Sequence, residues 1–215
     1  MKKFNLFIIL FMVAASTVYS QWDLSVAMGV DFKSAPKYRD YVNAVYGPYG
    51  KKLSTFSSAG NFSIELDYAG LKDFQPGIEY SLLIDSYNIS LQGGANELSY
   101  FIHRPSLLGF YKIEGEGYKF KFGLGAGLRI VEFTEKIITA TSYRSSGFGI
   151  VLKAEGISKI DGKLFVSVGF DLRYDSFDEL YNEELDKKII NYATGEAVDL
   201  NSVSAGIKLG IVYTF

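Results

Sequence analysis

Apolar and small or polar side chains alternate without a break in residues 202–215. Every second position from Val203 to Phe215 is apolar, and the positions between them are small or polar except for Val212. A period of two residues predicts a β-strand with one apolar face. In a closed barrel such a strand pairs with the first strand, so that no backbone edge is left unpaired. The pattern therefore favours a barrel that this strand closes.

The same alternation recurs in seven further segments. The expected strands cover residues 22–32, 56–68, 78–85, 98–113, 118–130, 148–155 and 164–175. The fourth segment changes phase, because Leu98 and Ile102 follow one alternation and Leu107 and Tyr111 follow the other. A β-bulge at Pro105, which lies between the two phases, would account for the change. The chain therefore predicts eight antiparallel strands.

The connections between these strands alternate in length. Long polar segments are expected at residues 33–55, 86–97, 134–146 and 176–199, and short turns join the remaining pairs. Outer-membrane barrels combine short periplasmic turns with longer external loops. A strand of about ten residues, at about 3.3 Å per residue and about 40° of tilt, crosses an apolar band of about 25 Å. We therefore expect an all-β, eight-stranded, up-and-down transmembrane β-barrel, narrow enough for side chains to fill its interior.

Alternation does not itself decide whether the apolar face points outward to lipid or inward, as in a soluble, secreted, lipocalin-like barrel that binds an apolar ligand. Two features favour lipid. The polar face of residues 118–130 and 202–215 is rich in Gly and Ser, which suits a crowded interior, and aromatic residues recur near strand ends, as in the girdles of membrane barrels. The ring near the short turns would hold Trp22, Tyr68, Tyr80, Tyr118, Tyr213 and Phe215, and the opposite ring Phe32, Phe56, Tyr100, Phe148 and Tyr174.

Residues 1–20 have the pattern of a secretory signal peptide. Lys2 and Lys3 precede an apolar run, and small residues follow it and offer a cleavage site before Gln21. The alternative is an N-terminal anchor, although the apolar run is shorter than the ~20 residues that a spanning helix needs. We expect a signal peptide at residues 1–20 and one barrel domain at residues 21–215.

Composition excludes several classes of chemistry. The chain has no cysteine, so disulfides, thiolate nucleophiles and a lipoprotein anchor are excluded. It has one histidine, so one chain cannot build a metal site from several histidines. A formal charge of −2 gives no reason to expect nucleic acid as a partner. The high content of Tyr and Phe, 16 and 17 residues, suits a surface where water meets lipid. We expect no cofactor.

The polar face would line the barrel interior and carries charges of both signs. An isolated charge in a narrow, poorly hydrated lumen costs several kcal/mol, so we expect these groups to pair and to plug the lumen. Lys208 in particular should find an acidic partner. A small selective channel is the alternative. The expected network is Glu65, Asp67, Glu79, Asp85, Lys119, Lys121, Arg129, Lys153, Glu155, Asp171, Arg173 and Lys208, with Asp175 nearby.

Two of the expected loops are oppositely charged. Residues 33–55 hold five basic residues and one acidic residue, a net charge of +4, and residues 175–199 hold two basic and eight acidic residues, a net charge of −6. Strand closure makes these loops neighbours, so they should attract each other and fold over the external mouth; two separately solvated loops are the alternative. Phe177, Leu180, Tyr181 and Leu185 are spaced like one face of a short helix. As a possible recognition surface for an extracellular or envelope partner, the first loop offers Tyr38, Tyr41, Tyr46 and Tyr49.

An enzyme that modifies lipid A is a further alternative. Such a hydrolase needs a His–Ser pair, and His103 is the only possible base, with Ser99 or Ser106 close in sequence. Residues at odd spacing on one strand point to opposite faces, so His103 and Ser106 would meet only if a bulge at Pro105 realigned them. We therefore predict that the protein is not an enzyme.

The chain resembles the OmpX-like and PorT-like outer-membrane β-barrel domains. The resemblance rests on the segment Arg-Pro-Ser-Leu-Leu-Gly-Phe-Tyr at residues 104–111, on Gly-Leu-Gly-Ala-Gly at residues 123–127 and on the closing Tyr213-Thr214-Phe215. It implies a monomer in the bacterial outer membrane, surrounded by lipid. The terminal Phe215, with Tyr213, resembles the signal by which barrel-assembly machinery recognises its clients. No catalytic residues come with this resemblance, because the family is defined by its barrel.

Overall fold

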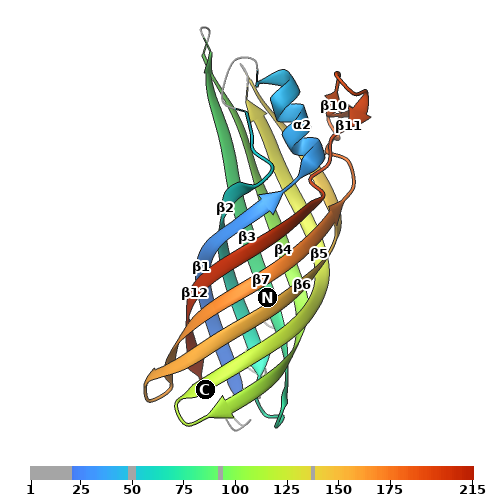
Figure 1. The fold of residues 1–215 in the computed structure, drawn as a ribbon. Coiled ribbons are helices and arrows are strands. Elements are labelled where there is room, and N and C mark those ends of the chain that lie inside the picture. Colours follow the sequence, from blue (N-terminus) through green and yellow to red (C-terminus); the bar gives the residue numbers. More distant parts are fainter. Residues whose placement is uncertain (1–20, 48–51, 92–93, 137–138) are drawn as a thin grey trace, which may run out of the picture.

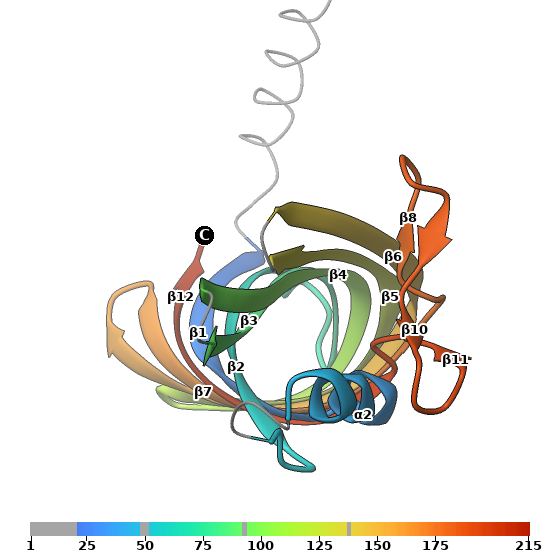
Figure 2. The same ribbon diagram turned by 90° about the horizontal axis from the view of Figure 1, so that it is seen from above.

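The computed structural model describes residues 21–47, 52–91, 94–136 and 139–215, and in them eight long antiparallel strands close into a barrel (Figures 1 and 2). Each strand pairs with its neighbours along the chain, and the first pairs with the last, which confirms the expected fold. The barrel strands are β1 (Trp22–Ser34), β2 (Ser57–Tyr68), β3 (Phe74–Leu91), β4 (Gly94–Gly115), β5 (Tyr118–Lys136), β6 (Ala140–Asp161), β7 (Leu164–Phe177) and β12 (Ser202–Thr214).

Strands β1 and β12 form the seam of the barrel. Their pairing runs from Asp23 opposite Thr214 to Ser34 opposite Val203 without a shift of register. The backbone N–H of Phe215 donates to the carbonyl oxygen of Trp22 at 2.9 Å, which continues the ladder one step beyond β12. Trp22 and Phe215 therefore lie at the same end of the seam.

The apolar face of every barrel strand points outward. Leu107 on β4, Leu128 on β5 and Leu209 on β12 expose 71%, 63% and 61% of their surface, whereas the charged residues between such positions are buried inside. A soluble barrel has the reverse arrangement, because its apolar face must leave water. The outward apolar belt therefore excludes the soluble, ligand-binding alternative.

Two hairpins extend well beyond the apolar belt. Strands β3 and β4 pair out to Leu91 opposite Gly94, and β5 and β6 pair out to Lys136 opposite Ala140. The expected loops at residues 86–97 and 134–146 are therefore wrong, because most of these residues lie in strands. Next to these extensions the inner face becomes apolar, with Leu98, Tyr100 and Ile102 of β4 and Val131 and Phe133 of β5 buried, and this reversal hides the strand pattern from a search for one continuous apolar face.

Strand β4 contains no bulge at Pro105. Its pairing with β3 is continuous, with Pro105 opposite Tyr80, and the ladder to β5 is interrupted between His103 and Leu107 without any change of register. Tyr100 is buried inside the barrel and Leu107 points outward, so the two apolar phases are two opposite faces of one regular strand. The bulge prediction is wrong, because proline removes a ladder hydrogen bond without inserting a residue.

A helix, α2 (Pro36–Val45), occupies part of the expected first loop and lies at the external mouth (Figures 1 and 2). Proline at the first helical position has no N–H to leave unpaired there. Tyr38, Tyr41 and Val42 are spaced three and four residues apart, so they share one face of the helix, and all three are buried. This apolar face explains why the segment folds onto the barrel.

The connection from β7 to β12 forms two small hairpins. They consist of β8 (Tyr181–Asn182) with β9 (Lys187–Lys188), and β10 (Ile190–Asn191) with β11 (Glu196–Ala197). The expected helical face is therefore wrong: Phe177 and Leu180 are buried, but Leu185 is exposed. The β10–β11 hairpin lies next to α2, whereas the β8–β9 hairpin projects beside β6, with which β8 pairs (Figure 2).

Candidate functional site

The middle of the lumen is organised around Glu79 of β3. Its carboxylate accepts hydrogen bonds at 2.7 Å from Arg173 of β7 and at 2.7 Å from Lys153 of β6. Lys208, for which we expect an acidic partner, lies 2.8 Å from Asp171 and 3.9 Å from Glu79. These side chains come from four different strands and are almost completely buried, so the pairs connect walls of the barrel that are distant in sequence.

Towards the end with the short turns, Lys121 is the central group. Its ammonium lies 2.7 Å from Glu65, 2.5 Å from Asp67 and 3.1 Å from Glu155. Two of these carboxylates, Glu65 and Glu155, also contact Lys153 and so link Lys121 to the pairs around Glu79. At the turn end Lys119 lies 2.6 Å from Asp23. The structure thus brings the expected acidic and basic groups into one chain of pairs.

Towards the external end, Arg104 of β4 joins two carboxylates. Its guanidinium lies 2.9 Å from Asp31 and 2.7 Å from Asp175, and Arg129 lies 2.5 Å from the other oxygen of Asp175. Asp85 differs from the other expected residues, because its partner is the hydroxyl of Tyr100, which donates to it. These ion pairs connect β1, β4, β5 and β7 across this part of the lumen.

Sequence reasoning missed several buried charged residues in the lumen. They are Asp23, Asp31, Lys33, Arg104 and Lys112. Alternation could have identified Asp23 and Asp31, which stand between outward apolar residues of β1. Arg104 and Lys112 were hidden by the assumed bulge, since a regular β4 places both on the inner face with Tyr100. Lys33 lies just beyond the expected end of the first strand.

Apolar side chains fill the space between the charged groups. Leu108, Phe110 and Val151 form a small buried cluster inside the barrel, and the ammonium of Lys121 lies 4.0 Å from the centre of the Phe110 ring. Gly123 makes room for this ring, since a Cβ there would lie 2.3 Å from a Phe110 ring carbon. These side chains lie in the section of the lumen beside Lys121.

Above the charged lumen lies a second core, which we call the external cap. It joins α2, the upper inner walls of β3, β4 and β5, and the β7–β12 connection. Its buried members are Ala35, Tyr38, Tyr41, Val42, Tyr46, Ala59, Leu83, Leu98, Tyr100, Ile102, Val131, Phe133, Phe177, Leu180, Ile189, Val198 and Leu200. A single apolar core over the mouth therefore contains residues of both oppositely charged segments, 33–55 and 175–199.

Polar contacts fasten α2 within the cap. Tyr41 and Tyr46 donate hydrogen bonds of 2.5 Å and 2.6 Å to one carboxylate oxygen of Glu135. Burial, and then the charge of Glu135, raises the pKa of the Tyr41 phenol far above its usual value, so the phenol remains a donor. Lys37 lies 3.0 Å from Asp199 of the β7–β12 connection. Among the described residues, the two loops thus share one ion pair and a much larger apolar contact.

The tyrosines proposed for recognition lie mostly inside the cap. Tyr38, Tyr41 and Tyr46 expose 4%, 6% and 3% of their surface. Contrary to the expectation, these three rings are not available to a partner, because their apolar faces are packed against the barrel extensions. Tyr49 lies outside the described residues. Tyr192, on the β10–β11 hairpin outside the cap core, exposes 90% of its surface, the highest fraction among the large apolar side chains that the structure describes.

The aromatic residues at the turn end of the seam are exposed on the outer wall. The rings of Tyr213 and Phe215 lie 5.1 Å apart, and those of Trp22 and Tyr68 lie 5.2 Å apart. Two expected girdle residues lie elsewhere. Tyr100 is buried in the cap, and Tyr80 lies part-way along β3, opposite Pro105.

The geometry does not support a His–Ser nucleophile. His103 faces outward and its Nδ1 lies 2.6 Å from the hydroxyl of Tyr80, whereas Ser106 is buried on the inner face. No group of three or more His, Cys, Asp or Glu side chains within the described ranges could hold a metal ion. In the same part of the chain, no helix is long and apolar enough to cross a membrane.

The sequence matches no protein-family model, and no curated protein matches it either. The fold, however, is similar to those of solved outer-membrane proteins. Neisserial surface protein A matches with a TM-score of 0.55 at 11% identity, covering 91% of this chain and 98% of that protein. Ail, the attachment invasion locus protein of Yersinia pestis, was solved with the heparin analogue sucrose octasulfate; it matches with a TM-score of 0.52 at 13% identity over 91% and 99%. A major outer membrane protein of Thermus thermophilus matches with a TM-score of 0.56 at 12% identity over 90% and 99%. The chain therefore has the fold of small outer-membrane β-barrels.

Proposed function

We propose that this chain is an integral protein of the bacterial outer membrane with a plugged lumen and a structural or interaction role at the cell surface. Residues 1–20 would direct its export and be removed. The continuous outward belt of apolar side chains supports membrane insertion, because water would not tolerate so large an exposed apolar surface on a monomer. Membrane lipid is then its principal environment, and the OmpX-like and PorT-like barrels remain the families that we propose for it.

The paired charges in the lumen are the main support for the proposal that the barrel is closed and does not conduct ions. Glu79, Lys121 and Arg104 each contact groups on other walls, and apolar rings fill the space near them. An ion entering here would have to displace pairs that are already stripped of water, at a cost of several kcal/mol per unpaired charge. The external cap adds a second closure above the network.

The outer surface of the cap is the part of the protein that partners would meet. Its hairpins present Tyr192 and Leu185, whose side chains are 90% and 52% exposed. Neisserial surface protein A and the attachment protein Ail share the fold, and their names support a surface role for this chain. The segment 175–199 has a net charge of −6 in sequence, which disfavours a polyanionic ligand such as the heparin analogue bound by Ail.

We further propose that Tyr213 and Phe215 serve as the signal for barrel-assembly machinery. Both rings are exposed at the turn end of the seam between β12 and β1. An unpaired β12 would present these two rings together with a free strand edge, which is the kind of template that another strand can recognise.

Conductance across a planar bilayer tests the plug. The refolded protein should insert, as shown by faster gel migration before boiling than after it, and should give no stable unit conductance. A reproducible conductance level from the inserted wild type would overturn the plug and favour the channel. Replacing Tyr192 with Ser and measuring attachment of the expressing cells to host-type surfaces tests the surface role, with exposed Tyr174→Ser on the belt as the matched control.

A further inference from the structure

A polar pair interrupts the apolar outer wall of the barrel. Tyr80 on β3 and His103 on β4 both point outward, and the Tyr80 hydroxyl lies 2.6 Å from His103 Nδ1. The cross-strand neighbours of His103 are Leu82 and Ile130, which are apolar. A polar or ionisable group on a lipid-facing position is unfavourable, so such groups mark functional sites more often than structural ones.

The depth of the pair matches the external margin of the belt. On β4 the outward positions beyond His103 are Phe101, then Ser99 and Glu97, so the apolar belt ends one outward position above the histidine. On β3, Leu82 and Ile84 are followed by Ser86. Residues along a strand are about 3.3 Å apart, and the strands are tilted. The His103–Tyr80 pair therefore lies within reach of the layer in which lipid headgroups begin.

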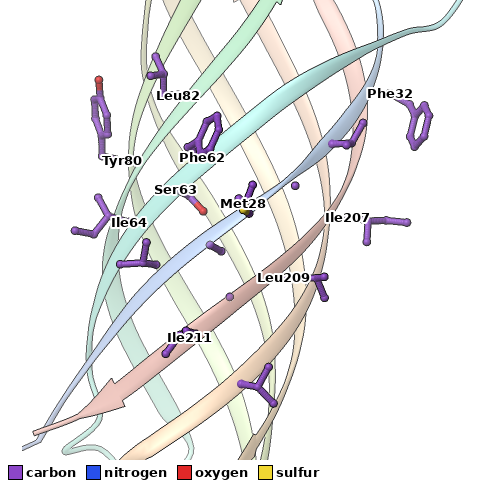
Figure 3. A pocket seen from close by; sticks show the side chains of 16 residues that line it. Met28, Phe32, Phe62, Ser63, Ile64, Tyr80, Leu82, Ile207, Leu209 and Ile211 are labelled. Carbon is purple, nitrogen blue, oxygen red and sulfur yellow. The ribbon is translucent and has the colours of Figure 1, made fainter.

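A wide apolar groove runs along the wall beside this pair (Figure 3). Its volume is about 1100 Å³, and it extends from β3 across β2 and β1 to β12. Tyr80 stands at one edge of the groove, with its hydroxyl oxygen pointing away from Ile64 (Figure 3). Other lining side chains are Val26, Met28, Val30, Phe62, Leu209 and Ile211. The groove thus offers an apolar floor and, at one edge, a polar anchor.

We propose that this groove binds a phosphorylated membrane lipid, with an acyl chain along the apolar floor and the phosphate at His103 and Tyr80. The proposal rests on the membrane location proposed above. The Tyr80 hydroxyl lies 2.6 Å from Nδ1, and we assign the phenol as the donor of this bond. That assignment places the imidazole proton on Nε2, the ring nitrogen that is left to donate to an anionic oxygen. A lipid fits better than another protein, because the floor is apolar apart from Ser63 and the donor lies where headgroups begin.

The tyrosine has two roles in this site. It fixes the orientation of the imidazole through the bond to Nδ1, and its ring forms one edge of the groove. Removing the hydroxyl alone leaves the groove intact but releases the imidazole, whereas removing the imidazole leaves the groove and the phenol. The two changes should therefore weaken headgroup recognition without affecting the affinity for a chain that lacks a phosphate.

Native mass spectrometry of the full-length mature barrel in detergent tests the site. The probes are dimyristoylphosphatidic acid and dimyristoylglycerol, which share their chains and differ by the phosphate. His103→Phe and Tyr80→Phe should each weaken the phosphatidic acid complex about tenfold, the size of one hydrogen bond to a charged group, and leave diacylglycerol unchanged. Tyr174→Phe, an exposed belt tyrosine on β7 outside the groove, is the matched control and should change neither.

A second pair of variants tests the floor. Val30→Trp fills the groove and should weaken both lipids, whereas Leu152→Trp, on an exposed belt position of β6, should weaken neither. Equal phosphatidic acid binding by the wild type and both polar variants overturns the site. Detection of a dimer of the chain instead of a lipid complex also overturns it. A barrel that fails to insert into bilayers refutes the membrane location; one that inserts but shows no dependence on His103 refutes the lipid site alone.

Discussion

Neutralising Glu79 is the most direct test of a dry, paired lumen. Glu79→Gln keeps the side-chain size but removes the charge that faces Arg173 and Lys153, each at 2.7 Å. Arg173 and Lys153, the two partners of the Glu79 carboxylate, are fully or nearly fully buried, so water does not replace the lost interaction. Breaking a buried pair by removing one partner costs about 3–5 kcal/mol.

The neighbouring acids place the expected cost at the lower end of that range. Arg173 retains Asp171 at 2.8 Å, and Lys153 retains Glu155 at 3.0 Å. We therefore expect Glu79→Gln to lower the free energy of unfolding by about 3 kcal/mol. Glu114→Gln is the control, because Glu114 lies 3.3 Å from Lys119 but is 46% exposed, and exposed pairs contribute about 0–1 kcal/mol.

Urea unfolding in lipid vesicles, followed by fluorescence of the single tryptophan, Trp22, measures these differences. A double-mutant cycle then separates the pair from its surroundings. Glu79 and Arg173 should couple by about 1.5–3 kcal/mol, and Glu79 and Lys208, which are 3.9 Å apart, by less than about 1 kcal/mol. A cost of less than about 1 kcal/mol for Glu79→Gln would refute the reasoning, since it would mean that water screens the network.

Four further predictions concern the cap and the assembly of the barrel. Tyr41→Phe removes the hydrogen bond to Glu135 and should lower the free energy of opening the cap by about 1 kcal/mol. The change is measured as faster proteolysis of the cap, and membrane insertion should be unchanged. Because burial and Glu135 raise the pKa of Tyr41, the wild-type cap should keep its hydrogen-exchange protection up to about pH 10 and lose it gradually above; a loss near neutral pH would contradict this. Lys37→Glu should lower the stability of the cap by no more than about 1 kcal/mol, because Lys37 of the Lys37–Asp199 pair is half exposed. Hydrogen-exchange protection should persist at high salt, because the apolar core supplies most of the stability of the cap. Deleting Phe215 should leave unassembled protein in cells, measured by heat-modifiable migration, and normal assembly would exclude the assembly signal.

The mouth of the barrel shows where pattern reading stops. Alternation identifies a strand only while one face stays apolar, and in β3, β4 and β5 the apolar face switches from outside to inside above the membrane belt. Tyr100 therefore faces the buried cap instead of the aromatic girdle expected for it, and Phe133, just beyond the expected end of the fifth strand, faces the same cap. The helix α2 was equally hidden, because its short apolar face gains stability only from contact with those strands.

Pro105 illustrates a second limit. An apparent change of phase has two explanations, a bulge or a reversal of which face is apolar, and the residues of one strand cannot distinguish them. Pairing with β3 decides the question, since Tyr80 opposite Pro105 keeps the register constant on both sides. The same decision places Arg104 inside the lumen between Asp31 and Asp175, where it joins the network that the assumed bulge concealed.

The sequence alone determined the number of barrel strands, their direction, the closure of β12 on β1 and the presence of one apolar face on each strand. These properties follow from local alternation and from the need to pair every backbone edge, and both can be read along the chain. The tertiary structure alone decided which charges meet, how the mouth is covered and where the wall carries its polar pair. Glu79, Arg173 and Lys208 stand on three strands, and only the stagger of a closed barrel brings them to one level. Beside the seam, the apolar positions of residues 202–215 became one side of a groove whose far edge is Tyr80.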